Sequence, residues 1–290
     1  MENKFIALCG LPRSGSTLLG NMLNQHPDIT VELDSCLSNL IHTVSEHSSK
    51  VEPEIQHTMD QTKRLYFSFM RSGISSWVNE VCNTKVYIDK CRGWQEDIHL
   101  FFNAVPNAKL ICLHRDLRGV ISSMNRAITS DRLGPVSYES LYGFDDGVDP
   151  YSENDLHEMK IMNFLNDEMI KMPLFFMRQC ISYEITEHLD KILFVRYEDM
   201  IENPRKELRK IYNFIGIDDY ENNLEHIEQI PYHDAVFSPY GNHTIKSKLI
   251  AKKSDYNFPS IKKSTQLKLI KNSIWYYKNF YPEVLEKLTS

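Results

Sequence analysis

Short apolar runs alternate along the chain with longer segments in which apolar residues recur every three or four positions. The runs over 4–9, 85–89, 108–114 and 191–196 are typical of buried strands. The helical periodicity predicts helices over 17–25, 35–48, 53–72, 95–104, 117–129, 155–188, 204–215 and 263–288, with Pro53 and Pro204 suited to first turns. Strands that alternate with helices predict an α/β fold with a central, mainly parallel sheet flanked by helices on both faces.

One stretch departs from this alternation. Residues 131–158 contain eight acidic side chains and a single basic one, Arg132, together with several glycines, prolines and tyrosines. We interpret the stretch as a surface insertion in a single domain over 1–290, and two readings stay open: a solvated acidic loop, or a lid over an acceptor.

The composition is that of an ordinary globular protein, with 42% hydrophobic and 25% charged residues. The formal charge of −6 argues against a general nucleic-acid binder, so an anionic ligand must be held by a local cluster of cations. No apolar run reaches the roughly 18 to 20 residues that a membrane-spanning helix needs, and the start of the chain does not resemble a secretory signal. These features predict a cytoplasmic protein without a membrane span.

The cysteines give no sign of a metal site or of disulfides. They are scattered, without a C-x-x-C pair, and several lie in apolar runs: Cys9, Cys36, Cys82, Cys91, Cys112 and Cys180. We therefore expect buried free thiols. No H-x-x-x-H pair lies on one helix face either, so the sequence offers no zinc-ligand pattern.

The strongest local pattern is a strand, a loop and a helix near the start of the chain. From Gly10 to Gly15 the loop has the G-x-x-x-x-G spacing of a phosphate-binding loop, in which backbone N–H groups and the next helix N-terminus bind an anion. A nucleoside-triphosphate loop needs Lys next, whereas Ser16 and Thr17 follow here. The loop suits an anion, has Arg13 as its only cation, and predicts a P-loop-like, three-layer fold.

The run Pro12-Arg13-Ser14-Gly15-Ser16-Thr17-Leu18-Leu19, continuing to His26-Pro27-Asp28, resembles the 5′-phosphosulfate loop of sulfotransferases. The similarity is greatest to tyrosylprotein sulfotransferases and related bacterial and viral members. These enzymes transfer a sulfuryl group from 3′-phosphoadenosine 5′-phosphosulfate to an acceptor hydroxyl or amine. The resemblance implies that the donor is bound by Arg13, Ser14, Gly15, Ser16 and Thr17, and that Arg13 also stabilises the transfer.

A second segment makes the resemblance more specific. Arg115 follows the run over 108–114, and Ser123 comes eight residues later, as in the family's 3′-phosphate-binding segment. A guanidinium at a strand end can pair with a phosphate while a hydroxyl group of the next helix donates from another side. Alone, such residues are more often a surface pair. Both signatures in the expected order favour nucleotide binding.

Further matches involve single residues. Lys90 stands where the tyrosylprotein enzymes carry a catalytic Lys, with a solvated strand-end lysine as the alternative. Tyr197, in the segment 194–199, matches a Tyr that contacts the adenine side, unless it is only a core aromatic residue. Lys246 and Lys248 fit a basic loop that closes over the nucleotide, and the sequence does not decide between them.

The acceptor needs a general base within hydrogen-bond reach. By its spacing after the His-Pro motif, the family's base falls on Asp34, although the glycine of the family's motif is absent here. Glu32 and a histidine are competing candidates. The Asp34 carboxylate could equally cap the helix that is expected to begin at Ser35.

The predicted function is sulfuryl transfer from 3′-phosphoadenosine 5′-phosphosulfate by in-line geometry, without a metal. Arg13 and Lys90 are the predicted electrostatic catalysts, and Asp34 the predicted base. Two alternatives stay open: a magnesium-dependent P-loop kinase or nucleotide hydrolase, and a non-catalytic binder of 3′-phosphoadenosine nucleotides. The acceptor is a hydroxyl or an amine of unknown identity. Because of the acidic insertion and the lack of a targeting segment, protein tyrosine is not the default acceptor.

Overall fold

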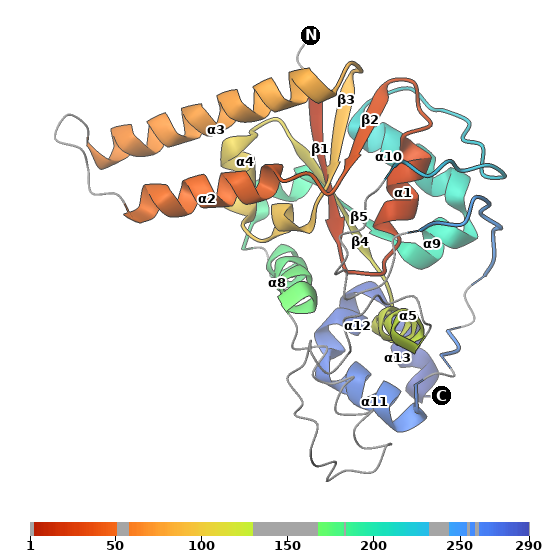
Figure 1. Ribbon diagram of the computed structural model, residues 1–290. Helices are drawn as coiled ribbons and strands as arrows, with labels where there is room; N and C mark the ends of the chain where they lie inside the picture. The colour runs from red at the N-terminus through yellow and green to blue at the C-terminus, as the bar shows by residue number, and fades with distance from the viewer. Residues whose placement is uncertain are drawn as a thin grey trace.

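Figure 1 shows the computed structural model, which describes residues 3–50, 58–129, 168–182, 184–231, 244–253, 256–258 and 261–289. In this part of the chain one sheet has the strand order β2-β3-β1-β4-β5, and each pair of neighbours is parallel. Its strands are β1 (Lys4–Gly10), β2 (Ile29–Leu33), β3 (Val86–Lys90), β4 (Lys109–His114) and β5 (Ile192–Arg196). The predicted α/β fold with a central parallel sheet is confirmed.

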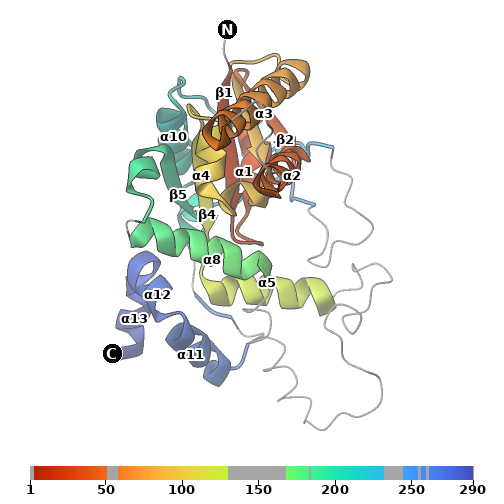
Figure 2. The ribbon, with the colours of Figure 1, turned by 90° about the vertical axis from the view of Figure 1, so that its left-hand side faces the viewer.

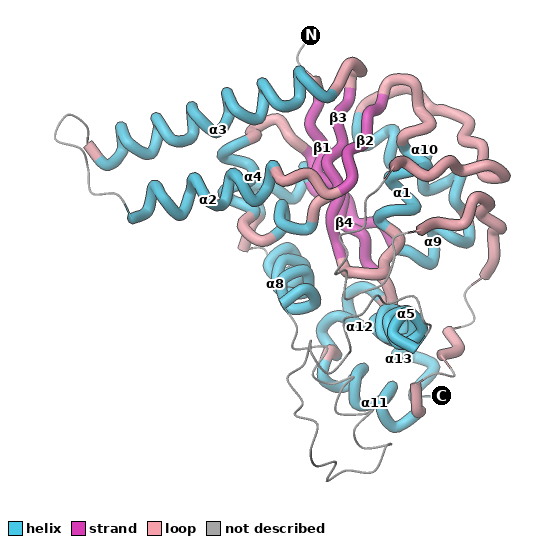
Figure 3. Tube along the Cα trace, in the orientation of Figure 1, coloured by secondary structure: helices cyan, strands magenta, loops and turns pink. Residues whose placement is uncertain are grey.

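Helices cover both faces of the sheet, which gives three layers (Figure 3). One face packs against α1 (Ser16–Leu23), α9 (Tyr197–Glu202) and α10 (Pro204–Ile215). The other packs against α2 (Leu37–Lys50), α3 (Met59–Val81), η1 (Arg92–Gln95), α4 (Ile98–Ala104) and α8 (Glu168–Ile181). Side chains of β1 alternate between the two cores: Ile6 and Leu8 face one, and Phe5, Ala7 and Cys9 face the other. This alternation is why an uninterrupted apolar run makes a central strand.

A group of helices lies beyond the carboxyl ends of the strands (Figures 1 and 2). It consists of α5 (Leu117–Thr129), α11 (Lys263–Asn272), α12 (Ile274–Phe280) and α13 (Pro282–Thr289). Helix α5 follows β4 after only Arg115 and Asp116. The C-terminal helices therefore lie at the edge of the sheet where ligands of parallel α/β folds bind.

The expected elements differ from the structure at several points. Strand β2 was not predicted, because five residues that directly follow a turn carry too little periodicity. Helix α3 begins at Met59, after the capping box of Thr58 and Gln61, and continues to Val81. The helix expected over 263–288 is three helices, since it is interrupted at Ser273 and before Pro282. Within 155–188, α8 ends at Ile181 and η2 (Thr186–Lys191) follows.

Some predictions fall outside the described residues or concern the thiols. The insertion at 131–158 and the helix start at Pro53 lie outside the described part of the chain. All six cysteines are free; Cys9, Cys82, Cys112 and Cys180 are buried as expected, whereas Cys36 is exposed. Among the described residues, none of the helices has the length and apolar character needed to cross a membrane.

Candidate functional site

The predicted site residues gather at the carboxyl edge of the sheet, one at the end of each strand. Arg13 follows β1, Asp34 follows β2, Lys90 ends β3, Arg115 follows β4 and Tyr197 follows β5. Parallel strands all end at the same edge of the sheet. After β1 the chain first forms β2 and β3 on one side of this strand, and then β4 and β5 on its other side. Such a switch point is where open α/β sheets bind their ligands.

Two glycines let the loop after β1 pass close to its neighbours. Gly10 has a φ of 131°, and a Cβ atom there would lie 2.1 Å from the carbonyl oxygen of Leu113 in β4. Gly15 has a φ of 90°, and its Cβ atom would lie 2.9 Å from Cδ2 of Tyr197. Because only glycine adopts these conformations without a side-chain clash, the G-x-x-x-x-G spacing fixes the path of the loop between β4 and Tyr197.

The rest of the loop presents backbone donors at the start of α1. Ser14 is buried, and its N–H and hydroxyl group both donate to the carbonyl of Leu11, so this residue closes the turn. The first helical hydrogen bond runs from the N–H of Leu19 to the carbonyl of Gly15, at 2.9 Å. The N–H groups of Ser16 and Thr17 precede it and have no acceptor within the helix, which makes this helix start suitable for an anion.

Two arginines and their partners form the centre of the site. The Nε of Arg13 donates to the Oγ of Ser123 in α5 at 3.3 Å, and the Nη1 of Arg115 donates to the carbonyl of Arg13 at 2.7 Å. The guanidinium of Arg115 lies over the ring of Tyr197, 4.0 Å from its centroid. Within the described ranges no carboxylate forms an ion pair with Arg115. The structure thus brings four predicted site residues together and leaves the charge of Arg115 available to an anion.

Lys90 and Asp34 form a second group on the other side of β1. The Nζ of Lys90 contacts the Oδ2 of Asp34 at 3.0 Å, and the lysine side chain is 8% exposed against 42% for the aspartate. Asp34 has a φ of 56°, and Arg13 likewise has a positive φ, of 58°. Residues other than glycine rarely adopt this conformation, and they cluster at functional sites.

The alternative interpretation of Asp34 as a helix cap is wrong. Helix α2 begins at Leu37 rather than at Ser35, so Asp34 lies outside its first turn. The N–H of Leu37 donates instead to the Oγ of Ser35, at 3.2 Å. The Asp34 carboxylate contacts Lys90 instead.

The competing base candidates are engaged elsewhere. Glu32 accepts hydrogen bonds from the Nε1 of Trp77, at 3.1 Å, and from the hydroxyl group of Tyr87. Burial raises the pKa of Tyr87, with Asp89 and Glu32 adding to the effect, so its hydroxyl group stays a donor. His26 accepts from the N–H of Asp28 at 3.0 Å, in a turn. Of the three candidates, Asp34 is the one whose carboxylate contacts Lys90.

Sequence analysis missed Asp89, which lies directly before Lys90. Its side chain is fully buried; Oδ2 accepts from the Oγ of Ser35 at 2.6 Å and from the Nε1 of Trp94 at 2.8 Å. Burial raises the pKa of Asp89 to about 6. The contact with Ser35 ties the segment that carries Asp34 to β3. The sequence feature that could have indicated a buried carboxylate here was an aspartate in an apolar run.

The two late lysines lie in an exposed segment. Lys246 and Lys248 are both exposed, and Lys248 forms an ion pair with Glu225. The backbone of this segment pairs with the residues around Ile227, whose N–H donates to the carbonyl of Ser247 at 2.6 Å. Their contact with a nucleotide stays a prediction.

Three side chains of the described residues could hold a metal ion together. They are His99 on α4, and Glu187 and His188 on η2, with their ligand atoms within 4.8 Å of one another. The His99 Nδ1 lies 3.5 Å from Glu187 and the His188 Nε2 lies 3.8 Å from it. The group is on elements other than those that carry the loop, Lys90 and Arg115, so it is separate from the candidate site.

Comparison with known proteins identifies the family. A family model described as "Sulfotransferase family" matches residues 6–222, which is more than half of the chain. A Caenorhabditis briggsae protein named "Putative protein-tyrosine sulfotransferase" is 25% identical over 231 residues, covering 78% of this chain and 70% of that protein. Nodulation protein NoeE of Sinorhizobium fredii is 23% identical over 238 residues, and the chain spans about half of its length, 53%.

Two solved sulfotransferase structures are among those that match this chain. The sulfotransferase domain of the Synechococcus PCC 7002 olefin synthase has a TM-score of 0.49 at 20% identity, covering 94% of this chain and 95% of that domain. The mouse sulfotransferase SULT7A1, solved in complex with PAP, has a TM-score of 0.41 at 18% identity, covering 75% and 61%. On the evidence of the family match, this chain belongs to the sulfotransferase family, whose members transfer a sulfuryl group from 3′-phosphoadenosine 5′-phosphosulfate to an acceptor.

Proposed function

We propose that the carboxyl edge of the sheet binds 3′-phosphoadenosine 5′-phosphosulfate across β1. The loop from Gly10 to Thr17 binds the phosphosulfate, and Arg115 with Ser123 binds the 3′-phosphate. Tyr197 packs against the adenosine. The contact between Arg13 and Ser123, at 3.3 Å, supports this assignment because it joins the two anion-binding regions.

The chemical step follows from the groups on the two sides of β1. An acceptor oxygen or nitrogen attacks the sulfur, the bond from sulfur to the 5′-phosphate oxygen breaks, and 3′-phosphoadenosine 5′-phosphate leaves. Asp34 takes the proton of the acceptor. Lys90 and Arg13 neutralise the charge on the sulfuryl and leaving oxygens. An ammonium has three N–H donors, so Lys90 can contact Asp34 and an anion at the same time.

One observation carries the proposal: Arg115 lies on Tyr197 and next to Arg13 without a carboxylate ion-pair partner in the described part of the chain. A buried or half-buried guanidinium usually has an anionic partner, because charge is costly to remove from water. A dianionic 3′-phosphate supplies that partner. The acceptor, whether hydroxyl or amine, reaches the sulfur from the side of Asp34. Metal independence, the cytoplasmic location and the contacts of Lys246 and Lys248 stay predictions.

Thermal unfolding with nucleotides tests the donor site. The chain is heated with 3′-phosphoadenosine 5′-phosphate, with ADP, or with ATP and magnesium. A ligand present at 100 times its Kd adds about 2.7 kcal/mol to the free energy of unfolding, which raises the midpoint by several degrees. We expect the largest shift with the 3′-phosphorylated nucleotide, and we expect Arg115→Ala to remove most of that difference.

The control variant is Arg209→Ala, which removes an arginine of the exposed ion pair with Asp219. It should leave the nucleotide shifts unchanged. A shift with only ATP and magnesium would favour the kinase alternative and contradict the proposal. Binding of the 3′-phosphorylated nucleotide without transfer to any of a broad panel of hydroxyl and amine acceptors would favour the non-catalytic binder.

A further inference from the structure

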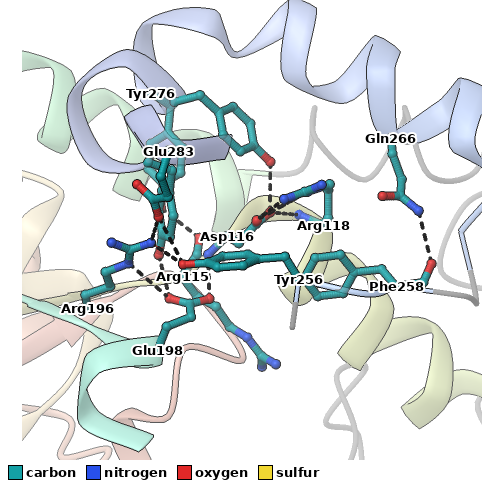
Figure 4. Close-up of polar contacts among 12 residues, drawn as sticks. Arg115, Asp116, Arg118, Arg196, Glu198, Tyr256, Phe258, Gln266, Tyr276 and Glu283 are labelled. Carbon is teal, nitrogen blue, oxygen red and sulfur yellow. Dashed lines mark hydrogen bonds and ion pairs between the residues drawn. The ribbon is translucent and has the colours of Figure 1, made fainter. Parts of the chain in front are cut away.

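Three buried tyrosines near the C-terminus donate hydrogen bonds to the residues around Arg115 and Tyr197. Tyr276, Tyr277 and Tyr281 all have 0% exposure. The hydroxyl group of Tyr276 donates to the carbonyl of Arg115 at 2.8 Å, and that of Tyr277 donates to the Oδ1 of Asp116 at 3.0 Å. Figure 4 shows Tyr276 above Arg115 and Asp116 in this arrangement. Burial raises the pKa of all three hydroxyl groups, so they stay protonated donors.

Asp116 sets the direction of the helix that carries Ser123. Its Oδ1 accepts from the N–H of Arg118 at 2.9 Å, and its carbonyl accepts from the N–H of Val120 at 3.0 Å, so it caps α5. The guanidinium of Arg118 contacts the same carboxylate at 2.6 Å. Because Tyr277 also donates to this carboxylate, the start of α5 is attached to α12.

The stacking partner of Arg115 is attached to the same tyrosines. Glu198 is the neighbour of Tyr197, and its Oε1 accepts from the N–H of Asp116 at 3.2 Å. Its Oε2 accepts from the hydroxyl group of Tyr281 at 2.8 Å. The buried Glu198 carboxylate and the tyrosine hydroxyl groups therefore connect the segment of Arg115 and Asp116 to the segment that carries Tyr197.

More residues of the C-terminal part surround this cluster. Arg196 contacts Glu283 and Tyr256, as the dashed lines in Figure 4 show. The ring of Phe258 lies over α5 at Gly119, where a Cβ atom would be 3.2 Å from Phe258 and 3.0 Å from the Nε of Arg115. Tyr256, Phe258, Glu283 and the three tyrosines all come after residue 222, where the match to the family ends.

We propose that Tyr276, Tyr277 and Tyr281 form the positioning element of the 3′-phosphate site, so that they set the preference for 3′-phosphorylated over unphosphorylated adenosine nucleotides. The proposal rests on the role of Arg115 in the proposed function. The tyrosines act through Arg115, Asp116 and Glu198 and touch no nucleotide themselves. Their hydroxyl groups hold the arginine backbone and the first turn of α5, so that guanidinium and Ser123 hydroxyl face the same phosphate.

Tyr276→Phe tests this role, because it removes one hydroxyl group and keeps the buried ring. Calorimetry gives the affinities for 3′-phosphoadenosine 5′-phosphate and for AMP, which lacks only the 3′-phosphate. We expect the ratio of the two affinities to fall about fivefold to tenfold, with AMP binding nearly unchanged. Tyr277→Phe is a second variant with the same expected direction.

Tyr212→Phe is the matched control. Tyr212 is also fully buried, and its hydroxyl group donates to the Oδ1 of Asn222 at 2.8 Å in the core on the α10 face. It should lower the midpoint of thermal unfolding and leave the affinity ratio unchanged. An unchanged ratio in both folded Tyr276 and Tyr277 variants, or an equal loss of affinity for both nucleotides, would overturn the proposal. If Arg115→Ala itself leaves the ratio unchanged, the assigned role of Arg115 fails instead.

Discussion

The two sides of β1 hold their charged residues in different ways. On the side of β4 and β5, Arg115 is fixed by an aromatic ring, by a backbone carbonyl and by a buried tyrosine. On the side of β3 and β2, Lys90 contacts Asp34, whose side chain is 42% exposed. On the first side the charged group is thus held by a ring, a backbone carbonyl and a buried hydroxyl group, whereas on the second side the carboxylate is partly exposed to solvent.

The carboxylates follow the same division. Glu32, Asp34 and Asp89 all lie on the side of β2 and β3, at or next to the strand ends. On the other side the nearby carboxylates of Asp116 and Glu198 are occupied by Arg118, a backbone N–H and tyrosine hydroxyl groups. The side of β4 and β5 therefore presents the guanidinium of Arg115 without a carboxylate partner among the described residues, whereas on the other side the Lys90 ammonium is paired with Asp34.

The largest effect is expected on the reacting side, for Lys90→Met. Because Lys90 is the predicted donor to the sulfuryl oxygens, its loss should lower kcat about 10²-fold to 10³-fold while nucleotide affinity changes little. Turnover and calorimetric binding of 3′-phosphoadenosine 5′-phosphate measure the two quantities. Lys85→Met is the control, since Lys85 forms an ion pair with Asp28 at 2.7 Å near the other end of β3. If Lys90→Met lost affinity for 3′-phosphoadenosine 5′-phosphate and kept its kcat, Lys90 would be a nucleotide-binding residue and not a catalytic one.

Asp34→Asn should have the next largest effect. Asparagine can still accept a hydrogen bond from Lys90 but cannot take a proton at neutral pH. If Asp34 is the base, kcat falls about 10²-fold, and the acid limb of the pH–rate profile is lost. Asp28→Asn, which alters the ion-pair partner of Lys85, is the control and should leave kcat and the pH–rate profile unchanged. Normal turnover in Asp34→Asn would reduce Asp34 to an ion-pair partner of Lys90.

The positions of these residues at the strand ends could be predicted from the sequence better than the contacts that hold them. The strand ends at Lys90 and Arg115 and the glycine spacing of the loop are local features, so they can be read from a short segment. Strand β2 and the positive φ of Asp34 depend on pairing with β3, which is distant in the chain. The roles of Asp89 and Tyr276 depend on burial among residues from several elements, and their sequence neighbourhoods resemble ordinary core.

A smaller effect is expected on the binding side for Gly119→Ala. The new Cβ atom would lie 3.0 Å from the Nε of Arg115 and 3.2 Å from Phe258, so the guanidinium must shift. We expect the affinity for 3′-phosphoadenosine 5′-phosphate to fall severalfold and the affinity for AMP to fall less. Calorimetry measures both affinities. Gly73→Ala is the control, because a Cβ atom there meets nothing within 4 Å, and alanine should stabilise α3 by about 0.5–1 kcal/mol. Unchanged affinities in Gly119→Ala would show that the position of Arg115 tolerates a shift of this size.

The smallest effects concern the pH dependence of stability, and they should have opposite signs on the two sides. Burial, with Arg196 and Lys210 adding to it, lowers the pKa of His114 in β4 to about 3, whereas burial raises that of Asp89 in β3 to about 6. Below pH 6.5 the unfolded chain protonates His114 before the folded chain does, so this residue makes the protein less stable as the pH falls.

Asp89 acts in the other direction, because between pH 4 and 6 the folded chain holds its proton more tightly than the unfolded chain, so stability falls as the pH rises. Each residue contributes at most about 1.4 kcal/mol per pH unit to the slope of the unfolding free energy. Urea unfolding between pH 4 and 6 should therefore show a flatter acid limb for His114→Gln and a steeper one for Asp89→Asn. His226→Gln, at an exposed histidine, is the control. If both variants change the slope in the same direction, burial does not favour deprotonated His114 on one side and protonated Asp89 on the other, and the contrast between the sides is limited to the ligand-binding residues.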